Sequence, residues 1–383
     1  MLRLRRGSAG VLCIPFLAAM SNQNALSVRA QNPDTTSPIQ LVPRTKAQRE
    51  QKYEAEHHIS LLVKVTDLSD KPVNGLKADD FSVLDNQKPQ KIERFREVDG
   101  KTFRADVHVL VVLDAINDGG SAVGHVKKDL DKFLSRGSGP LPFPFSLVFI
   151  SSAGVLQTQP STDRASIASR LAELARRPRD IECTLIEKLV PGMRAFSPQA
   201  GPRDAITQAD CNYNHFRESI NALRNLLGEK QNVRDRTILI WAGQGWPLGG
   251  LGNYPDVLVE LNTDLRKGQV TLDAVSWSEF YVPKGFRSGI TSVTASAPQT
   301  ADQVAAAAMR LPVIARQNGG QAIAKVKNFG SAMSACLADR NDFYVLTFDS
   351  APAATADEFH SIEVKVDRPG VNVRTASSYY AQP

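Results

Sequence analysis

Hydrophobic and polar positions follow different patterns in the middle of the chain and at its two ends. Towards either end, apolar and polar residues alternate in short runs separated by turn residues, which is typical of half-buried β-strands. These runs are residues 59–65, 81–86, 91–95, 343–348, 359–366 and 371–375. Because three strands at either end are too few for a stable sandwich, we expect the two ends to form one small β-sandwich together.

The middle of the chain, residues 105–340, has almost wholly apolar strands between segments of helical spacing. The expected strands are residues 107–113, 145–151, 155–158, 237–241 and 270–277, with a short one after Gly319-Gly320. The expected helices are residues 123–134, 163–176, 213–228, 254–267 and 328–338, with an alanine-rich one that starts near Asp302 and kinks or breaks at Pro312. This alternation predicts a doubly wound, mostly parallel α/β sheet, inserted in the β-sandwich.

The domain boundaries follow from these patterns. Residues 1–30 carry arginines before an apolar stretch and end in Val28-Arg29-Ala30, which resembles a small-residue cleavage site, so we expect a signal peptide. The alternative is a short membrane anchor that is never cleaved. Residues 31–56 are polar and contain prolines without periodicity, which predicts a disordered linker. The sandwich is expected to comprise residues 57–104 and 341–383.

The signal peptide changes what the net charge implies. The 383-residue chain has a formal charge of +6, but residues 1–30 hold four arginines and no acidic residue, so the rest carries only +2. A small excess of this kind does not favour nucleic-acid binding. Export predicts a secreted or periplasmic protein with no stable membrane span after cleavage.

Export also predicts an oxidising environment for the cysteines. Cys183 and Cys211 flank one proline-rich segment, and we expect a disulfide between them. Cys336 lies in an alanine-rich helical pattern and is expected to be a small buried residue. No Cys-x-x-Cys or Cys/His cluster predicts a zinc site.

Asp114 stands where ligand sites are common. It directly follows the apolar strand 107–113, and open α/β sheets bind ligands at the carboxyl ends of their strands. One interpretation is that Asp114 binds a metal ion. The other is that it caps the following segment by accepting hydrogen bonds from backbone amides, and this is the interpretation we favour.

Eight runs spread over the chain after the linker resemble one family of proteins. They are Val65–Asp67, Pro72–Phe81, Val111–Asp114, Thr237–Trp241, Asn318–Gly320, Phe343–Leu346, Ile362–Val371 and Ser378–Tyr380. Through these runs the chain resembles the von Willebrand factor A-related proteins abundant in acidobacteria. The resemblance covers nearly all of the chain after the signal peptide, and it implies architecture much more than activity.

The resemblance also implies a metal-ion-dependent adhesion site. In that site an Asp-x-Ser-x-Ser run follows the first strand, a threonine comes from a later loop, and an aspartate follows the fourth strand. Carboxylate and hydroxyl oxygens suit a divalent cation. Here Asp114 matches the first aspartate, but Ile116 and Asp118 replace the serines, and Gln244 is nearest to the distal aspartate. We therefore expect no metal; a divergent Mg²⁺ site using Asp114 and Asp118 is the alternative.

No other motif predicts catalysis. Gly243-Gln244-Gly245 lacks both the third glycine of a dinucleotide loop and the serine of a nucleophile turn. A secreted hydrolase is an alternative only because catalytic groups can be distant in sequence. The pair Asp79-Asp80 is expected to form a turn or cap rather than a calcium site.

We therefore expect an exported, non-enzymatic binding or adhesion protein that recognises a protein or cell-surface partner. Two long loops, residues 178–212 and 278–300, are expected to emerge near Asp114, and loop aromatics are common anchors. The alternative is that these aromatic side chains pack back onto their own domain. The predicted binding face comprises Asp114, Asn117, Asp118, Gln244, Trp246, Phe280 and Tyr281.

Overall fold

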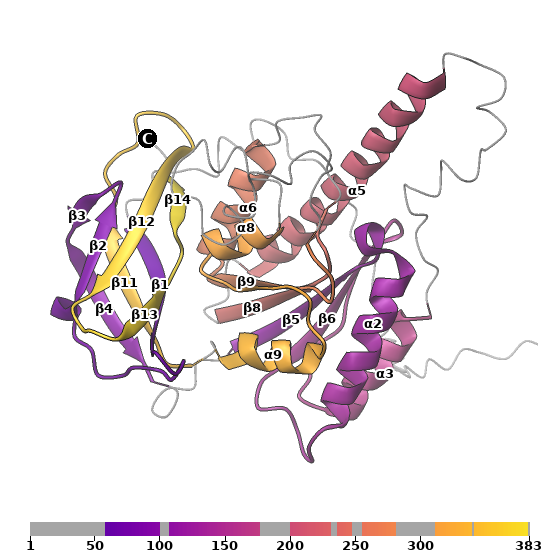
Figure 1. Cartoon of the computed structure of the whole chain (residues 1–383), viewed down its shortest axis with the longest axis horizontal. Coiled ribbons are helices and arrows are strands. Elements are labelled where there is room, and N and C mark those ends of the chain that lie inside the picture. Colours follow the sequence, from indigo (N-terminus) through magenta and orange to yellow (C-terminus); the bar gives the residue numbers. More distant parts are fainter. Residues whose placement is uncertain are drawn as a thin grey trace, which may run out of the picture. The chain divides into compact units, whose positions relative to one another are not determined.

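The structure is a computed structural model, and it describes most of the chain after residue 57. The described ranges are residues 58–99, 107–176, 200–230, 236–246, 255–280, 311–338 and 341–381 (Figure 1). The predicted signal peptide, the predicted linker, Cys183 and Tyr281 lie outside these ranges. Among the helices of the described part, none is both long enough and apolar enough to span a bilayer.

The middle of the chain forms a six-stranded sheet in which all neighbouring pairs except one are parallel. Its order is β10 (Ala322–Ile323), β9 (Val270–Val275), β8 (Arg236–Ala242), β5 (Val107–Asp114), β6 (Phe145–Ser151) and β7 (Gly154–Gln157). Strand β7 is the antiparallel one. This confirms the predicted mostly parallel α/β sheet. The chain order reverses between β5 and β8, which makes their carboxyl ends the switch point of the sheet.

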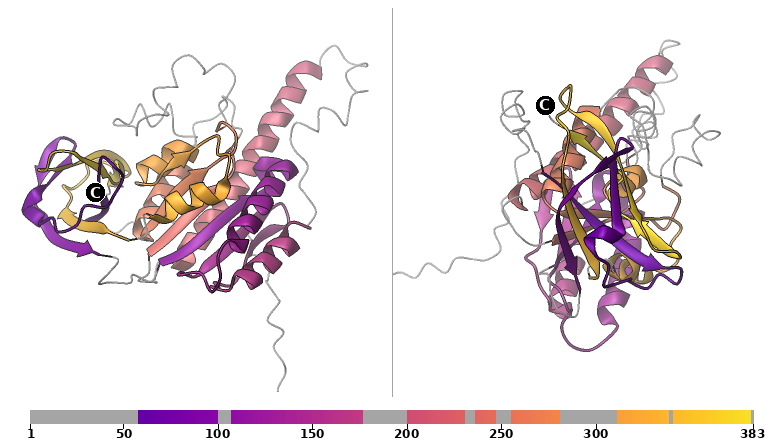
Figure 2. Two further views of the ribbon diagram at one scale, coloured as in Figure 1. Left: turned by 60° about the horizontal axis from the view of Figure 1, so that its bottom comes forward. Right: turned by 90° about the vertical axis from the view of Figure 1, so that its left-hand side faces the viewer.

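Helices cover both faces of this sheet (Figure 2). One face packs against α2 (Ala115–Ser135), α3 (Arg164–Leu174) and α9 (Phe329–Ala338), and the other against α5 (Ala200–Lys230), α6 (Pro255–Lys267) and α8 (Leu311–Gln317). Successive residues of β5 alternate between the two cores: Val111 belongs to the first and Val112 to the second. A strand covered on both faces must be apolar throughout, which explains the unbroken apolar run of β5.

Strands from before and after the α/β part form two antiparallel sheets with a common core. The first has the order β13 (Val371–Arg374), β1 (His58–Asp67), β11 (Phe343–Asp349) and β4 (Ile92–Val98). The second has the order β14 (Ser378–Ala381), β12 (Glu358–Val366), β2 (Phe81–Asp85) and β3 (Lys88–Gln90). Alternate side chains of β1, such as Leu61 and Val63, fill the core between them.

A buried polar cluster joins three strands of the second sheet. Asp85 of β2 accepts a hydrogen bond from the Tyr379 hydroxyl of β14 at 2.6 Å and pairs with His360 Nδ1 of β12 at 2.8 Å. Burial and the neighbouring Asp85 raise the pKa of Tyr379, so its hydroxyl keeps the proton that it donates. The histidine therefore has a structural role inside the sandwich.

Two helices begin earlier than expected. Helix α5 begins at Ala200, 13 residues before the expected start at residue 213, so residues 200–212 are helical and not part of a loop. Helix α2 begins at Ala115, eight residues earlier than predicted, because the Asp114 side chain caps its first turn. The glycines at 119 and 120 hid this start in the sequence. In α8, Pro312 is the second residue, a position that tolerates proline, whereas residues 302–310 of the expected alanine-rich helix lie outside the described residues. The 3₁₀ turn Ala78–Asp80 is capped by Asp80, as expected for a cap.

Candidate functional site

The carboxyl ends of β5 and β8 bring together residues that are far apart in the sequence. Leu113 pairs with Ala242 in the parallel register, so Asp114 and the segment Gly243-Gln244 leave the sheet side by side. This is the point where the strand order reverses, and ligand sites of open α/β sheets lie there. The candidate site is therefore built around Asp114.

Asp114 is held inside the fold by hydrogen bonds. Its side chain is 1% exposed, and Oδ2 accepts hydrogen bonds from Asn117 Nδ2 and from Ser219 Oγ, both at 2.8 Å. Oδ1 accepts a longer one, 3.3 Å, from the Asn117 backbone amide in the first turn of α2. A carboxylate at this position also suits the positive end of the helix dipole. The favoured interpretation of Asp114 as a cap agrees with this geometry.

Asp118 lies one turn further along α2 and reaches across to the end of β8. Its Oδ1 accepts a hydrogen bond from the Gln244 backbone amide at 2.7 Å. The carboxylate fills the space that Gly243 leaves open, since a Cβ built there would be 1.6 Å from Asp118 Oδ2. Asp118 Oδ2 itself is buried and has no hydrogen-bond partner among the described residues. A glycine at 243 is thus required by the position of Asp118.

The two carboxyl groups favour protonation. Burial raises the pKa of Asp114 to about 6, although the hydrogen bonds from Asn117 and Ser219 oppose this rise. Burial, and then repulsion from Asp114, raise the pKa of Asp118 well above its usual range. Two like charges in one buried site are costly. The pair therefore favours a proton on Asp118 near neutral pH.

The residues present fit poorly with the cation site that the family resemblance implies. Ile116 is buried in the core beneath α5 and offers no oxygen, and Gln244, which is nearest to the distal aspartate position, has no carboxylate. Asp114 Oδ2 and Asp118 Oδ1 already accept hydrogen bonds from protein groups. Within the described ranges, no group of three or more His, Cys, Asp or Glu side chains could hold a metal ion.

The structure corrects the predicted role of Trp246. Trp246 is only 3% exposed, and its ring packs edge-on against Trp241 of β8 and Phe216 of α5, so it belongs to the core. Phe280 is partly buried and packs against the same core. The prediction of Trp246 as a surface anchor was wrong, because a tryptophan after a strand can fold back under the neighbouring helix. Asn117 and Gln244 are part-buried, and Tyr281 lies outside the described residues.

Sequence reasoning missed two contributors to this edge of the sheet. Ser219 of α5 is fully buried and donates to Asp114, 105 residues away in the chain. Trp277 follows β9, and its ring stacks on that of His125 of α2 with centroids 5.9 Å apart. The helical spacing of α5 would have shown Ser219 on the apolar face beside Phe216 and Ile220, whereas nothing local marks Trp277.

The cysteines are placed as follows. Cys211 on α5 is disulfide-bonded, and Cys183, its expected partner, lies outside the described residues. Cys336 on α9 is fully buried and forms no disulfide, as expected for a small residue in an alanine-rich helix.

No protein-family model and no curated protein matches the sequence. Solved structures with partial similarity include a von Willebrand factor type A protein from Catenulispora acidiphila, with 7% identity and a TM-score of 0.32 over 86% of this chain and 74% of that one. Manganese-loaded TRAP protein from Plasmodium vivax has 10% identity and a TM-score of 0.31 over 74% and 96%. An aerotolerance-related membrane protein from Bacteroides fragilis has 12% identity and a TM-score of 0.30 over 62% and 98%.

Similarities this weak assign no function. The class of the protein therefore rests on its own topology, a doubly wound α/β sheet with a carboxylate pair at the switch point.

Proposed function

We propose that this chain is an exported, non-enzymatic binding or adhesion protein, in which an α/β module is carried in a β-sandwich formed by both ends of the chain. It recognises a protein or cell-surface partner through the loop face at the carboxyl ends of β5, β8 and β9. Recognition at this face does not require a metal ion.

The observation that carries the proposal is that the buried Asp114 carboxylate accepts hydrogen bonds from protein groups on two helices. Through Asn117 and Ser219 this carboxylate joins the start of α2 to α5, and Asp118 joins α2 to the end of β8. The pair thus fixes three elements of the sheet edge. A rigid edge of this kind is the usual support for recognition segments, and the chain leaves both β8 and β9 here.

The same geometry argues against the hydrolase alternative. A carboxyl pKa of about 6 suits general acid–base catalysis, and a serine lies within hydrogen-bonding distance. However, Ser219 is 0% exposed and donates its hydroxyl hydrogen to Asp114, which is equally buried. A nucleophile needs contact with substrate and a base that takes its proton. Because Ser219 and Asp114 are both buried, neither side chain can contact a substrate in this arrangement.

Residues at the end of β9 offer the clearest test of the binding face. Trp277 and Phe280 are partly exposed, and Glu279 between them is exposed and forms an ion pair with Lys325. We expect a partner captured from the envelope of the source cells to be bound at least tenfold more weakly by a Glu279→Arg/Phe280→Ala variant. Immobilised protein and quantitative mass spectrometry of the captured proteins measure this change.

A matched control for that experiment lies on the sandwich. Leu68 is 77% exposed at the end of β1, and Leu68→Ser removes apolar surface outside the proposed face. The control is expected to capture the same partner as the original chain. Equal capture by all three proteins, with unchanged thermal stability, would show that the assigned face is wrong.

A divergent Mg²⁺ site is a second candidate, and one observation favours it. Asn117 Oδ1 and Asp118 Oδ2 are both buried and lack hydrogen-bond partners among the described residues. With Asp114 they present the carboxylate and amide oxygens that Mg²⁺ accepts. A saturable gain in thermal stability with Mg²⁺ would favour this candidate over a carboxylate pair that holds a proton and no metal ion.

A further inference from the structure

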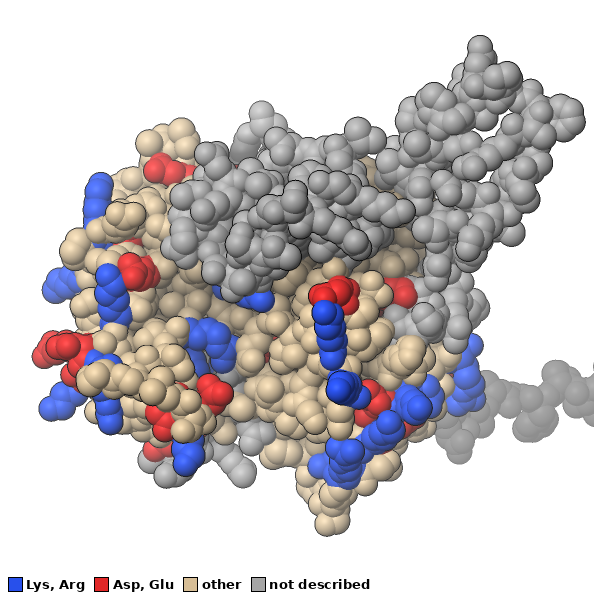
Figure 3. All heavy atoms as spheres, in the orientation of Figure 1, with Lys and Arg blue, Asp and Glu red and all other residues tan. Residues whose placement is uncertain are grey.

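A cleft of about 880 Å³ lies between strand β13 of the sandwich and the segment from α8 to β10. Its walls also include residues of β1 and α9. In Figure 3, basic side chains lie in the middle of this face of the molecule. The cleft is separate from the carboxylate pair, because Asp114 and Asp118 do not line it. Its volume is within the range of small-molecule sites.

Several donors that line the cleft have unmet hydrogen-bonding capacity. Arg316 Nη1 is buried and has no hydrogen-bond partner among the described residues, and the same holds for Thr375 Oγ1 and Ser377 Oγ. Burial lowers the pKa of Arg316, but a guanidinium stays charged at any physiological pH. A partly buried cation without a carboxylate partner is costly in the absence of a compensating anion.

These donors are held in place by close backbone packing. At Gly319, directly after α8, a Cβ would lie 2.8 Å from the Ala376 backbone nitrogen, so the two segments are in close contact. The Ser377 amide donates to the Gln317 carbonyl at 3.1 Å. Arg316 on one segment and Thr375 and Ser377 on the other are therefore fixed relative to one another. Such preorganisation lowers the cost of ligand binding.

The other charged residues that line the cleft form no ion pair with the Arg316 guanidinium in the described part of the structure. Lys64 Nζ donates to the backbone carbonyls of Ala338 and Asn341, both at 2.9 Å. Arg374 provides a second guanidinium in the wall, and Asp70 and Glu363 are the acidic lining residues. No ion pair joins either acid to Arg316 in the described part of the structure.

We infer that this cleft binds a small molecule through a carboxylate or phosphate group held by the Arg316 guanidinium, with the Thr375 and Ser377 hydroxyls as further donors. Arginine binds the oxygens of either group through paired N–H donors, and hydroxyl groups complete the coordination of an oxyanion. The remaining volume accommodates the rest of the ligand.

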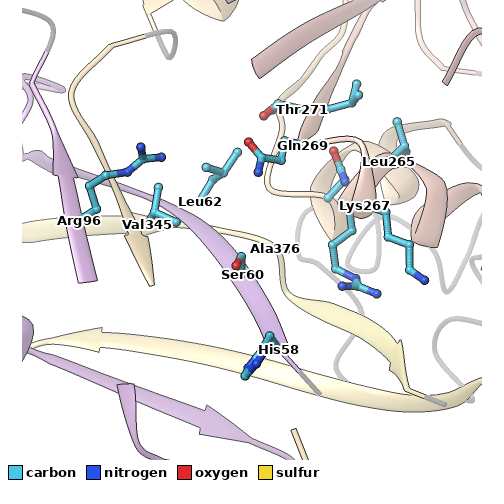
Figure 4. A pocket seen from close by; sticks show the side chains of 13 residues that line it. His58, Ser60, Leu62, Arg96, Leu265, Lys267, Gln269, Thr271, Val345 and Ala376 are labelled. Atoms are coloured by element: carbon cyan, nitrogen blue, oxygen red, sulfur yellow. The ribbon is translucent and has the colours of Figure 1, made fainter. Parts of the chain in front are cut away.

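A second cavity, of about 180 Å³, is a poorer candidate. Figure 4 shows its basic side chains Arg96 and Lys267 on opposite sides of the view. A third, Arg266, lies over the ring of Tyr379, with its guanidinium carbon 5.9 Å from the ring centroid. The volume is below the usual range for small-molecule sites.

Titration of the purified chain with inorganic phosphate, and separately with glucuronate, tests the inference. Thermal unfolding and calorimetry are followed at constant ionic strength, with chloride as the reference anion. We expect saturable binding of at least one probe, and at least tenfold weaker binding by Arg316→Gln. Binding of phosphate alone assigns a phosphate ligand, and binding of glucuronate alone assigns a carboxylate.

Two further variants keep the result interpretable. Arg170→Gln removes an exposed arginine of α3, outside the cleft, and is expected to bind as the original chain does. Thr375→Val retains all charges and is expected to weaken binding severalfold, which preserves a test if Arg316→Gln fails to fold. No saturable binding of either probe, or equal binding by every variant, would overturn the inference.

Discussion

The free energy of unfolding is expected to fall as the pH rises from about 4 to about 6, because of Asp114, and to fall further at higher pH, because of Asp118. Both carboxyl groups have raised pKa values in the folded protein, so the folded state binds their protons more tightly than the unfolded chain does. The stability from these groups is fully present below the unfolded pKa near 3.8 and is lost as the pH rises through the folded pKa. For Asp114 alone, the rise to about 6 corresponds to on the order of 3 kcal/mol.

The Asp118→Asn variant isolates this effect. Asparagine keeps an oxygen for the Gln244 amide but carries no charge, so the repulsion between residue 118 and Asp114 disappears. We expect a flatter pH dependence, and higher stability than the original chain near pH 8. Urea unfolding across the pH range measures both quantities. The control is Asp79→Asn, which removes one exposed carboxylate elsewhere. If both variants show the same pH dependence as the original chain, the carboxylate pair is not titrating as described.

Loss of Arg224 is expected to destabilise the fold by about 3–5 kcal/mol. This arginine of α5 is buried and pairs with two acids one turn apart on α6: its Nη1 with Glu260 and its Nε with Asp264, the latter at 3.0 Å. Arg224→Leu removes the guanidinium that pairs with both buried carboxylates, and the loss of one partner of a buried ion pair is costly. The midpoint of urea unfolding should fall with little change in its slope.

Two comparisons identify the cause of that loss. Combining Arg224→Leu with Glu260→Gln and Asp264→Asn removes all three charges and is expected to restore most of the stability. Arg170→Ala removes an exposed partner of Glu173 and is expected to cost less than about 1 kcal/mol. A triple variant no more stable than Arg224→Leu would show that packing, rather than unpaired charge, is the cause.

The sequence predicts the sheet far better than it predicts the site. The apolar run 107–113 indicates a strand covered on both faces, and β5 is indeed the central neighbour of β6 and β8. Asp114 was likewise predictable at the end of that strand. These features depend on local patterns, which a single sequence contains in full.

The features that the sequence did not reveal depend on distant contacts. Ser219 reaches Asp114 only because α5 crosses this face of the sheet, and Trp246 is buried only because Phe216 lies above it. The early start of α2 depends on the Asp114 cap, which outweighs the low helix propensity of the two following glycines. Such effects arise from tertiary packing, which no local pattern specifies.

The central claim is that hydrogen bonds and a bound proton stabilise the buried pair Asp114 and Asp118, so that the proposed binding face needs no metal ion. Calorimetric titration with Mg²⁺ and with Mn²⁺ at a pH above the Asp114 pKa of about 6 tests this most directly. We expect no saturable binding by the original chain, by Asp118→Asn or by Asp79→Asn. Saturable binding by the original chain and by Asp79→Asn, lost in Asp118→Asn, would contradict it.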